Sequence, residues 1–251
     1  MNHLDNRELD PKAFYDMMRE GAQPTTSQIN PDEYLEILTP ILKDGKDILV
    51  LAFSSGLSGT FNSARIATEE LKEQFPERKI LLVDTKSASL GEGLLVTLAA
   101  KKKADGASIE EVKAYAEEMI PKIAHWFTVD DIGHLVRGGR LSKTAGFIAK
   151  LANIKPVLSA SNEGKLEARH KAIGRKRAIK GLFDEMVKTA LPGPQVVYIG
   201  HGDDQEAVDY LVSLIKEKFE VSELVVSTIG PVIGAHTGAG VLALFFIGTQ
   251  R

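Results

Sequence analysis

The sequence predicts an α/β protein, because one pattern of strand, tight loop and helix occurs twice in succession. The apolar run from Ile48 to Phe53 leads into a loop and then an amphipathic segment that begins near Asn62. A second apolar run, Lys79 to Asp84, leads in the same way into the apolar helix predicted over Leu94 to Ala100. Short runs without polar alternation are typical of strands buried on both faces of a parallel sheet. The length of 251 residues and a hydrophobic content of 43% allow one or two well-packed domains.

A change of pattern near residues 122–125 indicates a domain boundary. Before it, strands and long helices alternate. After it, Trp126 to Val129 reads as a strand and is followed by acidic, basic and glycine-bearing loops. We therefore expect a first domain over residues 1–123 and a second over 124–251.

Composition excludes several classes of protein. The chain has no cysteine, so it has neither a disulfide framework nor a thiolate metal site, and a reducing compartment such as the cytoplasm is expected. Its net charge of −3 and pI near 6.1 argue against nucleic acid as a general partner. The longest uncharged apolar runs fall short of the ~20 residues of a membrane helix. The polar, acidic start Met1 to Asp5 does not resemble a signal peptide.

The first forty residues predict two helices joined by a hydroxyl-bearing loop. Proline at a first helical position favours starts at Pro11 and Pro31, and Pro24 to Gln28 lies between the two helices. Its Thr25, Thr26 and Ser27 suit simple helix capping as well as ligand contact. A domain that begins with two helices and no strand is unusual, so we expect either that the protein starts further upstream or that its first sheet lacks an edge strand.

The loop from Ser54 to Thr60 is the first candidate for a binding site. It lies between a strand and a helix, carries four hydroxyls and two glycines, and is expected to offer free N–H groups at a helix start. It lacks the lysine of a P-loop and the spacing of a dinucleotide fingerprint or nucleophile elbow. Hydroxyls and amides without a fixed cation suit a carboxylate better than a triphosphate. A plain Ser/Gly-rich turn is the alternative interpretation.

A second hydroxyl-rich loop, Thr85 to Gly91, follows the next strand. In a parallel sheet both loops can lie at the same edge, which strengthens the prediction of a site there. Ser108 with Glu111 forms a capping-box pattern that starts a further helix, which Pro121 ends.

The second domain is predicted to alternate strands, helices and glycine-rich turns. The turn Asn162 to Gly164 indicates a hairpin between two strands. The glycine-rich segment Gly230 to Gly240 surrounds His236 and Thr237, and a histidine in so flexible a frame can be aimed at a ligand. The remaining elements are a helix over 142–152, a helix to about residue 191, a strand at 196–200, a helix over 205–218, and strands at 224–228 and 241–247.

Basic residues crowd the start of the helix that runs to about residue 191. They oppose the helix dipole there, so local helix energetics do not explain them. A solvated face is the alternative to a binding role. The cluster comprises Lys171, Arg175, Lys176, Arg177 and Lys180.

Taken together, these motifs resemble those of the DegV family of bacterial fatty-acid-binding proteins over nearly the whole chain. The matching stretches are 24–28, 54–64, 84–91, 127–142, 153–156, 201–203 and 230–238. The resemblance implies a two-domain fold with a parallel-sheet first domain and a mixed-sheet second domain, and a tunnel between them that holds one long-chain fatty acid, such as hexadecanoate. It also implies that the carboxyl group is presented to a separate ATP-dependent fatty-acid kinase, whose acyl phosphate serves phospholipid synthesis. The expected partners are the fatty acid and the kinase, with transient membrane contact allowed and no other cofactor.

Transferred residue by residue, the resemblance places the carboxylate-binding threonine at Thr26, or at Thr25 if the register shifts by one. It places the carboxylate-binding serine at Ser58, with Ser55 as the neighbouring alternative. His236 matches the family's glycine-framed histidine, and Thr237 adjoins it.

The resemblance also assigns basic residues to contact with the kinase. Arg137 and Arg140 match the family's Arg-Gly-Gly-Arg stretch. Arg175, Lys176 and Arg177 fall in its positive surface, so that docking is expected to involve Arg137 and these three residues. The family usually begins with an additional strand and a Thr-Asp-Ser loop, which have no counterpart in this sequence.

An enzyme is the competing interpretation. Ser58 as nucleophile, His236 as base and Asp84 or Asp203 as orienting carboxylate would make a hydrolase acting on lipid esters, since triads occur in any chain order. We rank it below binding. The basic stretch near 165–180 lacks the interleaved aromatic residues of a nucleic-acid site.

Overall fold

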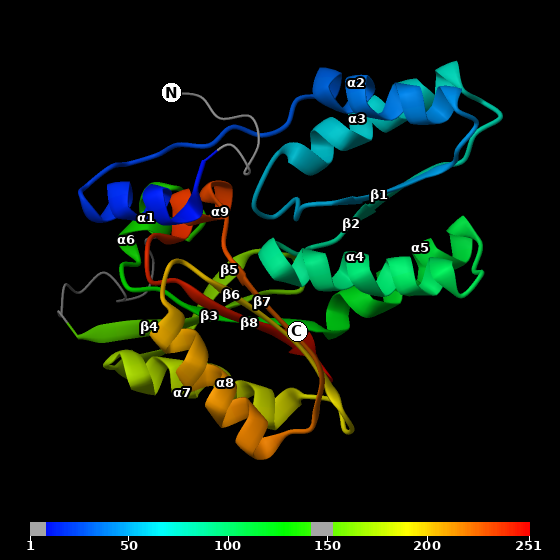
Figure 1. Ribbon diagram of the computed structural model, residues 1–251. Helices are drawn as coiled ribbons and strands as arrows, with labels where there is room; N and C mark the ends of the chain where they lie inside the picture. Colours follow the sequence, from blue (N-terminus) through cyan, green and yellow to red (C-terminus); the bar gives the residue numbers. More distant parts are fainter. Residues whose placement is uncertain (1–8, 142–152) are drawn as a thin grey trace. The chain divides into compact units, whose positions relative to one another are not determined.

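The computed structural model describes residues 9–141 and 153–251 of the chain (Figure 1). The helices are α1 (Pro11–Arg19), α2 (Pro31–Lys43), α3 (Thr60–Gln74), α4 (Ser89–Ala104), α5 (Ile109–Met119), the 3-10 turn η1 (Ile120–Lys122), α6 (Gly133–Arg137), α7 (Arg175–Thr189), α8 (Gln205–Lys218) and α9 (Pro231–Thr237). The strands are β1 (Ile48–Ala52), β2 (Ile80–Asp84), β3 (Ile123–Thr128), β4 (Ile154–Ala160), β5 (Leu166–Ile173), β6 (Gln195–His201), β7 (Val221–Thr228) and β8 (Leu242–Ile247). The helix predicted over 142–152 lies outside the described residues.

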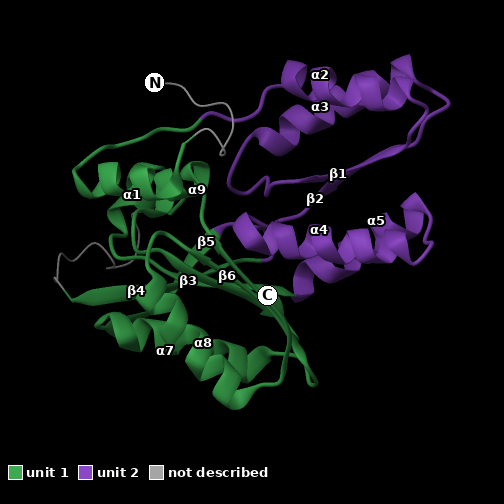
Figure 2. Cartoon of the chain, in the orientation of Figure 1, with its two compact units in different colours: residues 1–26, 123–161, 166–251 green, residues 27–122, 162–165 purple. Residues whose placement is uncertain are grey.

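The chain divides into two compact units (Figure 2). Unit 1 contains the described parts of residues 1–26 and 123–161 together with 166–251, and unit 2 contains 27–122 and 162–165. The change from unit 2 to unit 1 at Ile123 falls next to the expected boundary. The division differs from the predicted one at two other places, the amino-terminal segment and the turn between β4 and β5.

Unit 2 is built on the parallel pair β1 and β2, with Ile48 opposite Ile80 and Ala52 opposite Asp84. Helices α2 and α3 lie on one side of this pair, and α4 and α5 lie on the other (Figure 1). The core between α2, α3 and the strands consists of Leu38, Leu42, Ile48, Leu71 and Ile80. The predicted capping box of α5 is present, since Ser108 Oγ accepts from Glu111 N–H and the Glu111 side chain accepts from Ser108 N–H.

Unit 1 is built on a six-stranded sheet in the order β5-β4-β3-β8-β6-β7. Strands β6 and β7 are parallel, and the remaining neighbours are antiparallel. The predicted hairpin is formed by β4 and β5. The α/β class, with a parallel first sheet and a mixed second sheet, is therefore confirmed.

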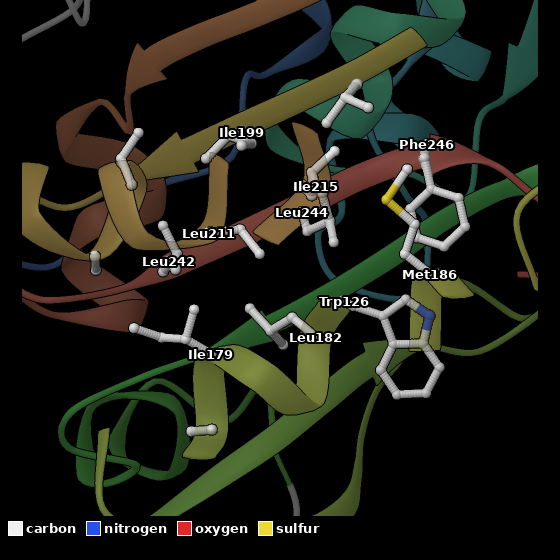
Figure 3. Close-up of a cluster of buried hydrophobic side chains, with 14 of the residues drawn as sticks. Trp126, Ile179, Leu182, Met186, Ile199, Leu211, Ile215, Leu242, Leu244 and Phe246 are labelled. Carbon is white, nitrogen blue, oxygen red and sulfur yellow. The ribbon is translucent and has the colours of Figure 1, made fainter. Parts of the chain in front are cut away.

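One face of this sheet is covered by α7 and α8 (Figure 3). Leu182 and Met186 of α7 and Leu211 of α8 are fully buried against Leu244 and Phe246 of β8. Because large apolar side chains from two helices and a central strand interlock there, this layer is the main apolar core of unit 1 and a rigid base for the loops at the strand ends.

Helix α1 explains why the amino-terminal segment belongs to unit 1 and not to the predicted first domain. Phe14, Tyr15 and Met18 are buried with Ala235 of α9 in one apolar cluster. Tyr15 Oη donates to Ile229 O at 2.7 Å, and Arg19 Nη1 lies 2.6 Å from Asp203 Oδ2. The sequence predicted a helix that starts at Pro11, but not which core its apolar side chains would join.

Candidate functional site

His236 is presented by a short helix, which corrects the prediction of a flexible glycine frame. Helix α9 begins with Pro231 at its first position, and Gly238 after its end has φ +80°. That angle is in the left-handed region that favours glycine, so Gly238 ends the helix. The glycines therefore set the bounds of a helix, and His236 sits half-buried in its last turn.

The side chains of Thr26 and His236, both in unit 1, are joined by a hydrogen bond of 2.8 Å between Oγ1 and Nε2. Burial and the Arg140 charge lower the pKa of His236 below its usual value, so the ring is neutral at pH 7. His236 Nδ1 is buried without a partner. We place the ring proton on Nε2, because no buried N–H is then left without an acceptor. Thr26 then accepts from the ring, and its own hydroxyl hydrogen is available for a ligand oxygen.

The Arg-Gly-Gly-Arg stretch packs against this histidine. A Cβ added at Gly138 would overlap His236 Nδ1, so the absence of a side chain lets the end of α6 approach the ring. Arg140 Nη1 donates to Gly138 O at 2.5 Å. Arg137 is exposed and donates from Nη2 to His134 Nδ1 at 3.1 Å. Gly138 thus lies against His236 and the Arg140 charge acts on it, while Arg137 is exposed.

In unit 2, Ser54 makes more of the described hydrogen bonds than any other residue of the hydroxyl-rich loop. It is fully buried, donates from Oγ to Gly164 O at 2.8 Å, and accepts from Gly56 N–H at 3.1 Å. Leu57 N–H and Ser58 N–H donate to Ser54 O. These contacts hold the 162–165 turn in unit 2. They also correct the expectation of free amides, because most of the loop's N–H groups bond within the loop or to its neighbours.

Ser58 and Thr60 share a hydrogen bond of 2.9 Å between their hydroxyl oxygens. Thr60 N–H also donates to Ser58 Oγ, at 3.2 Å. Ser58 is half-buried and Thr60 is buried, so the pair lies at the start of α3 with Ser58 outermost. Ser58 therefore stays a predicted head-group contact.

A cation does stand beside the loop, contrary to the sequence-based expectation. Lys86 Nζ lies 2.9 Å from Ser55 Oγ and 2.7 Å from Asp84 Oδ2. Asp84 Oδ1 accepts from Ser55 N–H at 3.1 Å, and the hydrogen bonds from Lys86 and Ser55 lower the pKa of Asp84 despite its burial. The carboxylate neutralises the ammonium, so Ser55 belongs to a polar network that is already paired.

The two other predicted ligand contacts differ in exposure. Thr25 is exposed, unlike its half-buried neighbour Thr26. Thr237 is buried and donates from Oγ1 to Ile233 O of its own helix at 3.1 Å. Of the two threonine registers left open by the sequence, the structure brings Thr26 to His236.

The predicted docking residues fall into two groups. Arg175 is half-buried and donates from Nη2 to Asp204 Oδ2 at 2.8 Å and to Gly240 O at 2.5 Å. Lys176 and Arg177 are exposed, and Lys176 Nζ lies 5.8 Å from the centre of the Tyr210 ring. The ion pair between Arg175 and Asp204 explains why an arginine is accommodated at the start of α7, because the carboxylate offsets the positive charge there.

The partners of His236 do not form a hydrolytic triad. A base needs a carboxylate on one ring nitrogen, yet Nε2 bonds to Thr26 and Nδ1 is unpaired. Asp203 pairs instead with Arg19, and Asp84 with Lys86. Within 9–141 and 153–251, His, Asp and Glu also form no cluster of three that could hold a metal ion.

Fold and polar groups together define a two-unit α/β protein, with Thr26 bonded to a neutral imidazole in unit 1 and a hydroxyl-rich loop in unit 2. Comparison with known proteins gives the family. The DegV family model matches residues 2–249, and the chain belongs to that family. A DegV domain-containing protein of Clostridium perfringens is 48% identical over 99% of this chain and 87% of its own length.

Solved structures agree with this assignment. The fatty-acid-binding DegV family protein of Thermus thermophilus superposes with a TM-score of 0.85 and 32% identity, covering 96% of this chain and 85% of that one. The Fatty Acid Kinase (Fak) B3 protein of Streptococcus pneumoniae, loaded with linoleic acid, superposes with a TM-score of 0.85 and 27% identity, covering 95% and 84%. Among the described helices, none is long and apolar enough to cross a membrane.

Proposed function

We propose that this protein binds one long-chain fatty acid and presents its carboxylate to a separate ATP-dependent fatty-acid kinase. The observation that carries the proposal is the hydrogen bond between Thr26 and His236. It leaves the threonine hydroxyl as a donor for an anionic oxygen, in a chain similar to proteins described as binding fatty acids.

Energetics favour a modest head-group site. A C16 to C18 acyl chain would bury on the order of 400–500 Å² of apolar surface, worth roughly 10 kcal/mol before ordering costs. Polar contacts then need only orient the carboxylate. Hydroxyl donors and a neutral imidazole leave its oxygens more reactive toward a phosphoryl donor than a tight arginine pair would.

The kinase part of the proposal rests on the likeness to the pneumococcal Fak B3 protein and on exposed cations of unit 1. Arg137, Lys176 and Arg177 are exposed. Exposed charges mainly set the rate of association and its salt dependence. Arg175 is assigned to the internal pair with Asp204 instead, so the docking proposal retains the other three.

Mass spectrometry of the purified protein tests ligand binding. Under native conditions the mass should exceed that of the chain by one fatty acid, and denaturation should release it. Protein from which no acyl species can be extracted, and which also fails to bind added oleate or palmitate, would refute the proposal. Hydrolysis of p-nitrophenyl esters that is lost in Ser58→Ala would favour the hydrolase instead.

Charge reversal tests presentation separately from binding. Lys176→Glu with Arg177→Glu should leave fatty-acid content unchanged and lower acyl-phosphate formation by a cognate kinase, with a smaller defect at high protein concentration. Lys216→Glu with Lys218→Glu, an equal charge change at the other end of a neighbouring helix, serves as the control. Equal rates in the two double variants would remove the docking role.

A further inference from the structure

Thr60 lies between Ser58 and a backbone amide in a chain of hydrogen bonds within unit 2. Ile29 N–H donates to Thr60 Oγ1 at 3.3 Å, and Thr60 Oγ1 lies 2.9 Å from Ser58 Oγ. Thr60 is only 8% exposed, so water has little access to its hydroxyl. The segment that carries Ile29 is held close by Gln28, whose Nε2 donates to Ser63 Oγ at 3.1 Å.

The hydrogen bond between Thr60 and Ser58 can run in either direction, because each hydroxyl keeps one hydrogen and one lone pair beside its backbone contact. A hydroxyl has one hydrogen to donate and two lone pairs that accept. Thr60 Oγ1 accepts from Ile29 and keeps its own hydrogen to donate, and in the direction that our inference assigns, this hydrogen goes to Ser58 Oγ. Ser58 Oγ then accepts from both the hydroxyl and the N–H of Thr60, which fills its two lone pairs. The one capacity that Ser58 retains is its own hydroxyl hydrogen.

From this geometry we infer that Thr60 is a positioning residue, which fixes Ser58 as a hydrogen-bond donor to the carboxylate of the bound ligand. The inference rests on the proposed function, because it assigns a direction to one of the predicted head-group contacts. Without Thr60, the Ser58 hydroxyl could rotate and donate its hydrogen bond to another acceptor within the loop. Successive hydrogen bonds polarise one another, so the relay also strengthens the terminal donor.

A double-mutant cycle on oleate affinity tests the inference. Thr60→Val, which removes the hydroxyl at nearly constant shape, should weaken binding about fivefold, as expected for one hydrogen bond. The same change in a Ser58→Ala background should have no further effect, because the donor is already gone. Thr60→Ser restores the hydroxyl and should bind within about twofold of the unsubstituted protein.

Thr68→Val is the matched control, since Thr68 is another buried threonine of α3 whose hydroxyl donates to a carbonyl of its own helix. It should not change affinity, even where it lowers stability. The second readout is the carboxyl resonance of bound [1-13C]oleate, which should move equally in Thr60→Val and Ser58→Ala and stay in place in Thr68→Val. If Thr60→Val does not fold, Thr60→Ala replaces it in the cycle.

The outcomes separate the two levels of the proposal. Normal oleate binding by the unsubstituted protein, with an unchanged affinity and resonance in Thr60→Val, would overturn the role of Thr60 and leave the proposed function intact. Additive losses in the two single variants would overturn the relay as well. No binding by the unsubstituted protein would refute the proposed function, and the inference would fall with it.

Discussion

The two polar regions that the sequence singled out differ in how many of their hydrogen-bonding groups are already paired. In the loop from Ser54 to Thr60, buried Ser54 accepts and donates within unit 2, and most neighbouring amides are paired. At the Thr26 and His236 pair, a ring nitrogen stays buried without a partner and the threonine hydroxyl keeps its hydrogen. A dense run of hydroxyls therefore indicates a polar network. A ligand can be bound where single atoms can still donate or accept a hydrogen bond.

The largest expected effect tests whether the loop network is structural. Ser54→Ala removes a buried hydroxyl and leaves Gly164 O and Gly56 N–H unpaired, so the free energy of unfolding should fall by about 3 kcal/mol. Ser55→Ala, an exposed neighbour, should change it by less than about 0.5 kcal/mol. Denaturant unfolding measures both, and equal losses would remove the distinction between the two serines.

A smaller loss of unfolding free energy is expected near Thr26 and His236, where the backbone at Gly138 lies close to the histidine ring. Gly138→Ala would place a methyl group against His236 Nδ1 and should cost about 2 kcal/mol through overpacking. Gly93→Ala in the middle of α4 is the control, because an added Cβ there meets only Leu90 at 3.8 Å and the helix gains from alanine. Unchanged stability in Gly138→Ala would show that the ring can move aside.

Neighbouring threonines provide a sharper contrast in ligand affinity. Thr26→Val should weaken oleate binding by about 1 kcal/mol, since it deletes one hydrogen-bond donor, whereas Thr25→Val should leave affinity unchanged. Isothermal titration of delipidated protein gives both values. A larger loss at Thr25 would shift the site by one residue.

The smallest effect concerns pH. His236 has a pKa below its unfolded value, so the unfolded chain binds the proton more tightly and stability is lost as pH falls below about 6.5. His236→Asn removes that contribution and should flatten the dependence of unfolding free energy on pH in this range. The NMR titration of the ring checks the premise, and a pKa at or above the usual value would contradict it.

Much of the fold can be predicted from local sequence patterns. The features that could not be predicted mostly depend on contacts between residues far apart in the sequence. The apolar runs gave β1 and β2, and the Ser108 capping box gave α5, because strand and cap signals lie within a few residues. Helix α9 was not predicted, since its glycines suggested a loop, although Pro231 was a usable start signal.

At the site, the sequence named Thr26, Ser58 and His236 through the family resemblance, but it could not reveal which of their atoms are already bonded. Lys86 was overlooked as the loop's cation because it belongs to the second hydroxyl-rich loop, 31 residues along the chain from Ser55. Arg175 looked like a surface cation because its partner Asp204 lies far along the chain.

The grouping of α1 with unit 1 has a consequence for the order of folding. Unit 2 is almost continuous in sequence, whereas unit 1 is interrupted by residues 27–122 and needs Tyr15 to meet Ile229. Contacts of such long sequence separation form slowly, because the intervening chain must first be closed into a loop. During synthesis we expect the amides of unit 2 to become protected from exchange before those of unit 1, because unit 1 cannot form until its last strands have been made. The segment that carries Thr26 would therefore remain without its contacts in unit 1 until β7 and α9 have emerged.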